Sequence, residues 1–252
     1  MKALITGGIG DWFVTDSHWD DATRAVLTDI YLATSRAAYL KELIRAVRDY
    51  NHVEIHELQD RVFEHFIVSD LQNEQEVREH FKDLPSDIKD FSLRKVWKQE
   101  YDTFYGSTYL KRNLTVPFLT KDMERLPYIV ICPASIHGRT FTLMDWQRVR
   151  AFLHTESYLG VILYKGEIKI KKDPYFEDLT NRTSLLESIE ILKHPNCCGY
   201  IGVDSCLAVL ASQLFYPEGL VVVSNNPQYM EFAGHYCAPH KDFPFVVEGL
   251  RF

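Results

Sequence analysis

The sequence has few cysteines and no long apolar run. Its five cysteines are odd in number and never spaced as Cys-x-x-Cys, so neither a disulfide framework nor a zinc-cysteine site is indicated. No apolar run reaches the ~18 residues that a membrane span needs. The first residues break at Gly7-Gly8 before the apolar core of a secretory signal is long enough. We therefore expect a cytoplasmic protein without a membrane span.

The sequence also has fewer positively charged than negatively charged residues. The chain has 28 Lys and Arg against 35 Asp and Glu, a formal net charge of −7. Because contacts with nucleic-acid phosphates need clustered cations, this balance disfavours a surface built to bind nucleic acid. The hydrophobic fraction of 46% is typical of a globular protein, and 252 residues suffice for one large or two small domains.

Strand-like and helix-like segments alternate along the chain. Short apolar runs predict strands at 2–6, 28–35, 52–58, 128–132 and 160–164. Helical periodicity predicts helices at 36–50, 143–154 and from Ser184 onward, with Thr142 as a cap. Such alternation indicates an α/β protein with parallel sheets. We expect two Rossmann-like domains, at 1–120 and 121–235, and a tail at 236–252 that packs back on the first domain.

One helix start has the sequence expected of an anion site, and a glycine-rich turn presents a carboxylate at a second place. After the apolar run 199–203, Asp204 and Ser205 are good cap residues for the helix that follows. A helix that begins at the carboxyl edge of a parallel sheet directs backbone N–H groups towards a phosphate. Near the N-terminus, a glycine-rich turn that includes Gly10 presents Asp11 after the first strand, although no third glycine completes the dinucleotide-binding pattern. An ordinary capped βαβ unit is the alternative interpretation of the first, and for the second the alternative is that Asp11 caps the helix that follows.

Four segments resemble the heptosyltransferase-type glycosyltransferases. They are MKALITGGIGDW, YIVICPASIHGRTFTLMDWQRVRAFL, LTNRTSLLESIEIL and CGYIGVDSCLAVLASQLFYPEGLVVVS. They occur in the family's order and cover about half of the chain. The resemblance implies a GT-B fold of two facing Rossmann-like domains, with the acceptor bound by the first and a nucleotide-diphosphate sugar, of UDP or ADP type, by the second. There are two departures: Cys206 stands where the family has glycine, and Val209 stands where it has histidine.

The resemblance also assigns roles to residues. Asp11 matches the base that removes the acceptor's proton, with Asp16 and His18 as substitutes, and a carboxylate can do this chemically. Arg139 matches the cation that stabilises the departing diphosphate, and Asp204 the group that holds the donor sugar. Glu187 is a candidate for the ribose or an exposed side chain. The remaining donor-binding candidates are Gly10, Ser135, Thr183, Ser184, Ser205 and Cys206.

The predicted reaction uses no cofactor and no metal, because no Asp-x-Asp pair follows a strand and no His/Cys cluster has ligand spacing. Inversion at the sugar carbon is implied by the resemblance alone. The expected acceptor is a glycan or lipid-linked saccharide. The alternatives are a hydroxymethylated pyrimidine in DNA, as in phage enzymes, and a non-catalytic nucleotide-sugar-binding protein. A nucleotide-sugar epimerase or dehydrogenase is disfavoured, because a Tyr-x-x-x-Lys pair is missing from the first half.

Overall fold

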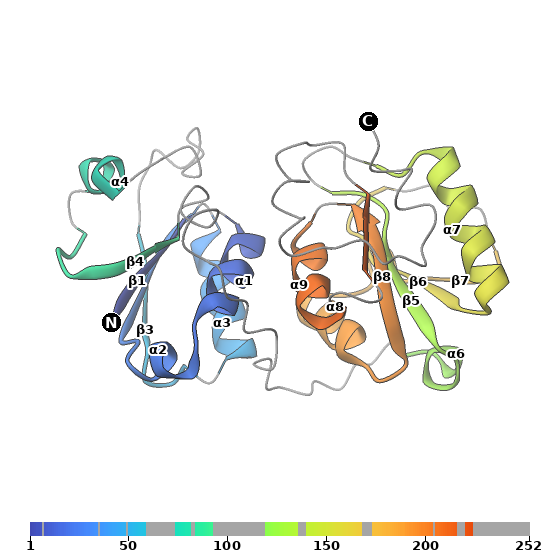
Figure 1. The fold of residues 1–252 in the computed structure, drawn as a ribbon, viewed down its shortest axis with the longest axis horizontal. Coiled ribbons are helices and arrows are strands. Elements are labelled where there is room, and N and C mark those ends of the chain that lie inside the picture. Colours follow the sequence, from blue (N-terminus) through green and yellow to red (C-terminus); the bar gives the residue numbers. More distant parts are fainter. Residues whose placement is uncertain are drawn as a thin grey trace. The chain divides into compact units, whose positions relative to one another are not determined.

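The computed structural model divides the chain into two compact units, Met1–Arg112 and Asn113–Phe252. It describes residues 1–6, 8–34, 36–48, 50–58, 74–81, 84–92, 119–135, 140–167, 173–203, 205–215 and 220–223. Each unit contains one parallel sheet with helices on both faces (Figure 1). The α/β class predicted from the sequence is therefore confirmed. Within the described ranges, no helix has the length and apolar character to cross a membrane.

The sheet of the first unit has the strand order β3-β2-β1-β4, and all its pairings are parallel. In Figure 1, α1 and α3 lie on one face of this sheet and α4 on the other. The strand order reverses between β1 and β4, and open α/β sheets bind ligands at the carboxyl ends of strands at such a reversal. The elements are β1 (Lys2–Thr6), α1 (Ile9–His18), α2 (Asp21–Ala25), β2 (Asp29–Ala33), α3 (Ala37–Val47), β3 (Glu54–Glu57), α4 (Glu74–His80) and β4 (Ile88–Ser92).

The sheet of the second unit has the order β7-β6-β5-β8-β9, again parallel throughout. Figure 1 shows α8 and α9 on one face and α7 on the other. Here the order reverses between β5 and β8. The elements are α6 (Lys121–Arg125), β5 (Tyr128–Cys132), α7 (Leu143–Glu156), β6 (Leu159–Ile162), β7 (Phe176–Asp178), α8 (Leu185–Lys193), β8 (Cys197–Val203), α9 (Cys206–Phe215) and β9 (Leu220–Val223).

One core cluster of the second unit lies between its sheet and α7. Ile131, Ile162 and Ile201, one from each of three strands, are fully buried and pack with Val149 and Leu153 of α7. Burial of each such aliphatic side chain stabilises the fold by about 1.5–3 kcal/mol relative to exposure. The apolar run 128–132 that predicted a strand is buried at every position, so helices cover β5 on both faces.

Helix α7 begins where its cap residues predict. Thr142 and Asp145 form the two reciprocal hydrogen bonds of a capping box, and the helix ends at Ser157 in the left-handed conformation. The predicted cap at Thr142 is confirmed. The start of α1 differs from the prediction, because the backbone N–H of Trp12 already donates to the carbonyl of Gly8 at 3.2 Å. Gly10 and Asp11 therefore lie in the first turn of α1 and not in a loop before it.

Short elements were missed. The sequence analysis did not predict β4, β7, α2 or α6, and β7 has only three residues. Too few residues are present there for a periodic pattern to show. The tail at 236–252 lies outside the residues that the structure describes.

Candidate functional site

The second sheet brings the ends of β5 and β8 together at its order reversal. Cys132, the last residue of β5, is in register with Gly202 of β8, and its Sγ lies 3.9 Å from Ser205 Oγ. Ser135 lies in the loop that leaves β5, and Cys206 is the first residue of α9. These three predicted donor-binding residues, Ser135, Ser205 and Cys206, therefore belong to the loops of the same carboxyl edge.

The N-terminus of α9 is held in place by hydrogen bonds of Ser205. The backbone N–H of Ala208 donates to Ser205 Oγ at 3.2 Å, which is the bond of a helix cap. The Tyr200 hydroxyl lies 3.2 Å from the same oxygen and donates to the Val203 carbonyl. The first turn of α9 contains no acidic residue. Its positive dipole end is thus not balanced by a carboxylate from that turn, which suits a phosphate group.

Gly202 makes room for this arrangement. A Cβ at position 202 would meet the Tyr200 hydroxyl and would lie 2.7 Å from the carbonyl oxygen of Cys132. The backbone carbonyl cannot rotate away as a flexible side chain can. A glycine at this point therefore lets the Tyr200 hydroxyl reach from β8 to the cap of α9.

The N-terminus of α8 is different, because a carboxylate already occupies it. Ser184 and Glu187 form a capping box in which the Ser184 N–H donates to Glu187 Oε2 at 2.6 Å. Thr183 is buried, and its hydroxyl oxygen lies 3.1 Å from that of Ser188, which in turn donates to the Ser184 carbonyl. The negative charge of Glu187 opposes a second anion here. Of the two helix starts, α9 is the better phosphate site.

Asn181 is a structural residue of this edge that the sequence analysis missed. Its side-chain amide donates to the Gly166 carbonyl at 2.8 Å and accepts from the Gly166 N–H at 2.9 Å. Asn181 itself has a φ of 60°, a conformation that asparagine tolerates better than most residues. The pair joins the loop after β6 to the loop after β7. The only signal in the sequence was the polar stretch at 180–184.

The predicted catalytic pair stays a prediction. Asp11 lies in the first turn of α1, at the carboxyl end of β1 beside the order reversal of the first sheet, but its side chain is outside the described part of the chain. The same holds for Arg139, for Asp204 and for the side chain of His18.

The structure corrects the prediction made for Asp16. It was a substitute for the base, yet it is 1% exposed and forms an ion pair with Arg48. The Tyr50 hydroxyl donates to its Oδ1 at 2.9 Å, and Arg24 Nε lies 4.0 Å from the same atom. A carboxylate that is buried among such partners cannot reach an acceptor hydroxyl. Its role is to fasten the C-terminal end of α1 to α2 and to the end of α3.

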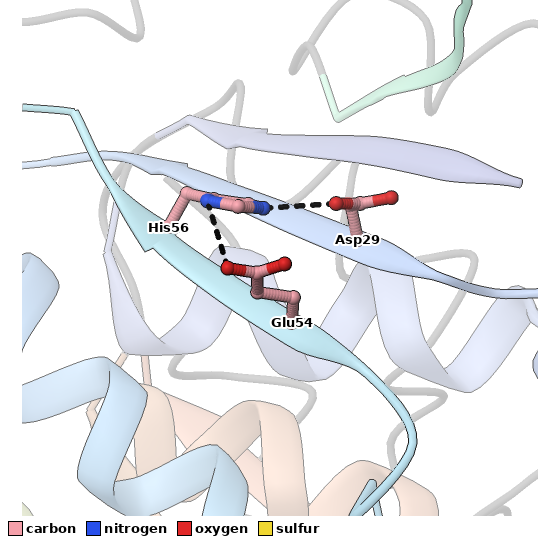
Figure 2. Close-up of side chains that lie close together, drawn as sticks. All are labelled: Asp29, Glu54 and His56. Atoms are coloured by element: carbon pink, nitrogen blue, oxygen red, sulfur yellow. Dashed lines mark hydrogen bonds and ion pairs between the residues drawn. The ribbon is translucent and has the colours of Figure 1, made fainter.

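A second cluster of titratable groups, also missed, lies at the opposite edge of the first sheet. Figure 2 shows His56 of β3 between Asp29 of β2 and Glu54 of β3. Its Nε2 lies 2.9 Å from Asp29 Oδ1, and its Nδ1 lies 4.0 Å from Glu54 Oε1. The hydrogen bond to His56 is the main cause that lowers the pKa of the Asp29 carboxyl below its ordinary value. Alternation placed Glu54 and His56 on one face, but only the register of β2 with β3 brings Asp29 beside them.

Comparisons with known proteins agree with the fold. No family model and no curated protein matches the sequence. Among solved structures, a glycosyl transferase of family 9 from Veillonella parvula DSM 2008 aligns with a TM-score of 0.56 at 10% identity, over 98% of this chain and 95% of that one. The iron-containing dodecameric glycosyltransferase TibC from enterotoxigenic E. coli H10407 aligns with a TM-score of 0.48 at 15% identity.

This chain spans 56% of the length of TibC, and 88% of this chain is aligned. A second TibC structure, in complex with ADP-D-beta-D-heptose, aligns with a TM-score of 0.46 at 14% identity. The family 9 structure, unlike the two TibC structures, is matched over nearly the whole of both chains. The protein therefore has the α/β fold of this glycosyl transferase of family 9, with two units that each contain a parallel sheet.

Proposed function

We propose that this protein is a glycosyltransferase that moves a sugar from a nucleotide-diphosphate donor, of ADP or UDP type, to a hydroxyl of a saccharide acceptor. The observation that carries the proposal is the N-terminus of α9. It lies at the order reversal of a parallel sheet, is capped by Ser205, and has no acidic residue in its first turn. The GT-B fold and the sequence resemblance support the same activity.

The diphosphate binds at the first turn of α9. The first N–H groups of a helix point out of its N-terminus, and together with the helix dipole they stabilise negative charge. Cys206 contributes its backbone N–H, so the replacement of the family's glycine by cysteine leaves this contact possible. Arg139 and Ser135, from the loop after β5, complete the phosphate site. Asp204, the residue that follows Val203 in the sequence, holds hydroxyls of the donor sugar.

The α8 start has a secondary part in donor binding. Ser184 is exposed and its Oγ accepts the capping bond from the Glu187 N–H, so its hydroxyl hydrogen can be directed towards the ligand. Thr183 supports Ser184 from beneath through Ser188. The donor's ribose is uncharged, so it is compatible with both the Ser184 hydroxyl and the nearby carboxylate of Glu187.

Transfer proceeds by direct displacement. The acceptor oxygen forms a bond to the anomeric carbon while the bond from that carbon to the diphosphate oxygen breaks. Asp11 accepts the acceptor's proton as general base, beside Gly10 in the first turn of α1. Arg139 stabilises the charge that grows on the leaving diphosphate. One displacement inverts the sugar carbon, and no metal is needed where a guanidinium and helix amides supply the positive charge. We expect the reaction to take place in the cytoplasm, an expectation that comes from the sequence alone.

The N–H of Cys206 can be removed without ending the helix. Proline is tolerated at the first helical position, and Cys206→Pro deletes one donor there. Lys121→Pro makes the same change at the first position of α6, which leads into the amino end of β5. Loss of one hydrogen bond to a charged group costs about 1.5–3 kcal/mol. We expect ADP or UDP to bind Cys206→Pro ~10- to 150-fold more weakly than wild type, and Lys121→Pro to bind like wild type.

Titration calorimetry with ADP and with UDP measures this difference, and circular dichroism verifies that both variants are folded. Equal affinity of Cys206→Pro and wild type would remove the α9 N-terminus from the donor site. Release of the nucleoside diphosphate from ADP- and UDP-sugars, with saccharide acceptors, then tests Asp11→Asn. Donor binding without turnover by wild type would favour the non-catalytic alternative. Turnover only with hydroxymethylated DNA would replace the saccharide by the phage-type acceptor.

A further inference from the structure

The amino edge of the first sheet has its own cluster of ligand-type side chains, on the face that α4 occupies. Asp29 is the first residue of β2, and Glu54 is the first residue of β3. His56 follows Glu54 by two positions, so both point to the same side of the strand. Tyr31, two positions after Asp29, packs against the core cluster that includes Val77 of α4. The cluster is therefore on the opposite edge of the sheet from Asp11, and it is independent of the proposed transfer reaction.

We propose that Asp29, Glu54 and His56 form a binding site for a divalent transition-metal ion of the Zn²⁺ type. One ligand atom from each of the three residues lies within 4.8 Å of the other two. Two ligand atoms on a tetrahedral zinc ion are about 3.4 Å apart, since zinc–nitrogen and zinc–oxygen bonds are about 2.0–2.2 Å long. His56 Nε2 and Asp29 Oδ1, now 2.9 Å apart, would have to separate by only a few tenths of an ångström.

The imidazole is already oriented for this role. The rings of His56 and Tyr31 stack with centroids 4.5 Å apart and planes 13° from parallel, which holds Nε2 towards Asp29. On the other side, the Thr28 hydroxyl donates to Asp29 Oδ2 at 2.8 Å and leaves Oδ1 for a ligand. Such hydrogen bonds from surrounding groups are what fix metal ligands in position. Both strands are part of a parallel sheet, so the separation of Asp29 and His56 is set by the backbone pairing.

Glu54 is the adjustable member of the three. Its side chain is 76% exposed, and its distance of 4.0 Å from His56 Nδ1 is longer than a hydrogen bond. It can therefore turn towards an ion without the loss of a bond. Three protein ligands leave at least one position for water, as in zinc sites that are open to solvent.

The local charge favours a divalent cation. Asp29 and Glu54 each carry a negative charge, and the one cation of the neighbouring strand, Lys2, forms an ion pair with Asp87 at 3.1 Å. The donor set of one imidazole nitrogen and two carboxylate oxygens fits zinc, iron or manganese better than calcium, which binds oxygen atoms alone. Zn²⁺ is the ion with which the site is best tested, because it binds this mixed set most strongly among them.

Zn²⁺ titration calorimetry of the full chain, with and without Glu54→Gln or His56→Gln, tests the site. We expect one Zn²⁺ per chain in wild type and at least tenfold weaker binding in each variant. Glu57→Gln is the matched control for Glu54→Gln, since it removes one carboxylate from the same strand; His154→Gln in α7 is the control for His56→Gln. Both controls should bind Zn²⁺ as wild type does.

Cobalt absorption separates this site from the cysteines, because a nitrogen and oxygen site lacks the charge-transfer bands of a thiolate ligand. Glu54 is exposed, so Glu54→Gln tests the proposal even if His56→Gln fails to fold. The proposal is overturned if wild type binds no Zn²⁺ at 1:1 stoichiometry, if Glu54→Gln binds as tightly as Glu57→Gln, or if cobalt reports thiolate ligation.

Discussion

The two sheets share the order in which their first four strands are arranged, but their second strands differ in burial. In the second unit, β6 is buried at all four positions. In the first unit, β2 holds the same place, yet Asp29 and Tyr31 are only partly buried while Ile30 between them is fully buried. A parallel strand covered on both faces is apolar throughout, whereas alternation indicates a face that is partly open to water.

This difference shows that one topology can serve two kinds of polar site. In the second unit the polar groups gather where strands end, at the caps of α8 and α9. In the first unit the trio of Asp29, Glu54 and His56 lies on the surface of the sheet itself. The carboxyl edge follows from topology, but the open face depends on which helices cover the strands.

The largest effect of burial is expected in β8, where the adjacent residues Cys197 and Cys198 differ in exposure to solvent. Cys197 is buried and Cys198 is exposed. Burial favours the neutral thiol and raises the pKa of Cys197 to about 12. At pH 8 only about one Cys197 in ten thousand is a thiolate, and the thiolate is the reactive form. Desolvation raises the pKa of the Cys198 thiol too, but Cys198 is exposed. We therefore expect alkylation, located by mass spectrometry, to modify Cys198 at least ~10²-fold faster than Cys197 in the folded protein.

Denaturation with urea should bring the two rates together. Rapid modification of Cys197 without denaturant would show that its side chain reaches solvent, which would contradict the burial of that face of β8.

The next test compares the effect on stability of substitutions at adjacent positions in β6 of the second sheet and in β3 of the first. In β6, Val161 and Ile162 are both fully buried, so Ile162→Ala should lower the free energy of unfolding by about 2–5 kcal/mol and Val161→Ala by about 2 kcal/mol. In β3, Ile55→Ala should cost about 2–5 kcal/mol, while Glu54→Ala, at an exposed position, should stay within about 0.5 kcal/mol. Urea unfolding, followed by hydrogen exchange to identify the unit affected, measures each change. A large decrease in the free energy of unfolding of Glu54→Ala would contradict the difference in burial between β6 and β3.

A smaller effect than those of Ile162→Ala and Ile55→Ala is expected at Gly202. Gly202→Ala places a methyl group against the Cys132 carbonyl and the Tyr200 hydroxyl, and overpacking of this kind costs about 1–3 kcal/mol. It should also weaken ADP or UDP binding, because the Tyr200 hydroxyl is displaced from Ser205. Gly160→Ala is the control, since its methyl group meets only side chains of the core. Gly160→Ala should lower stability and leave the affinity for nucleotide unchanged. Equal nucleotide affinities of Gly202→Ala and Gly160→Ala would count against a role of Tyr200 at the donor site.

Much of the fold could be predicted because local rules were sufficient. The start of α7 at Thr142 and that of α8 at Ser184 follow from cap residues three positions before their partners. The strand at 128–132 follows from an unbroken apolar run. The start of α1 was wrong because Gly8 gives no side-chain signal of a cap, and β7 was missed because its pattern is too short.

The candidate site was predictable only in part. Sequence identified Ser184 and Ser205 as helix caps, and it treated them as equal partners of a phosphate. The structure separates them, because the carboxylate of Glu187 bonds to the start of α8 while the first turn of α9 has none. Asp16 looked suitable by its position after Asp11, but burial with Arg48 and Tyr50 removes it from the chemistry.

The sequence by itself determined where strands and helices alternate, which helices are capped, and hence that two parallel α/β units form. Those features depend on residues a few positions apart, whose interactions are present in the local chain. Only the tertiary structure decided that Cys132 lies beside Ser205, and that Asp29 lies beside His56. Strand register and side-chain burial join residues that are distant along the chain, and no local pattern specifies them.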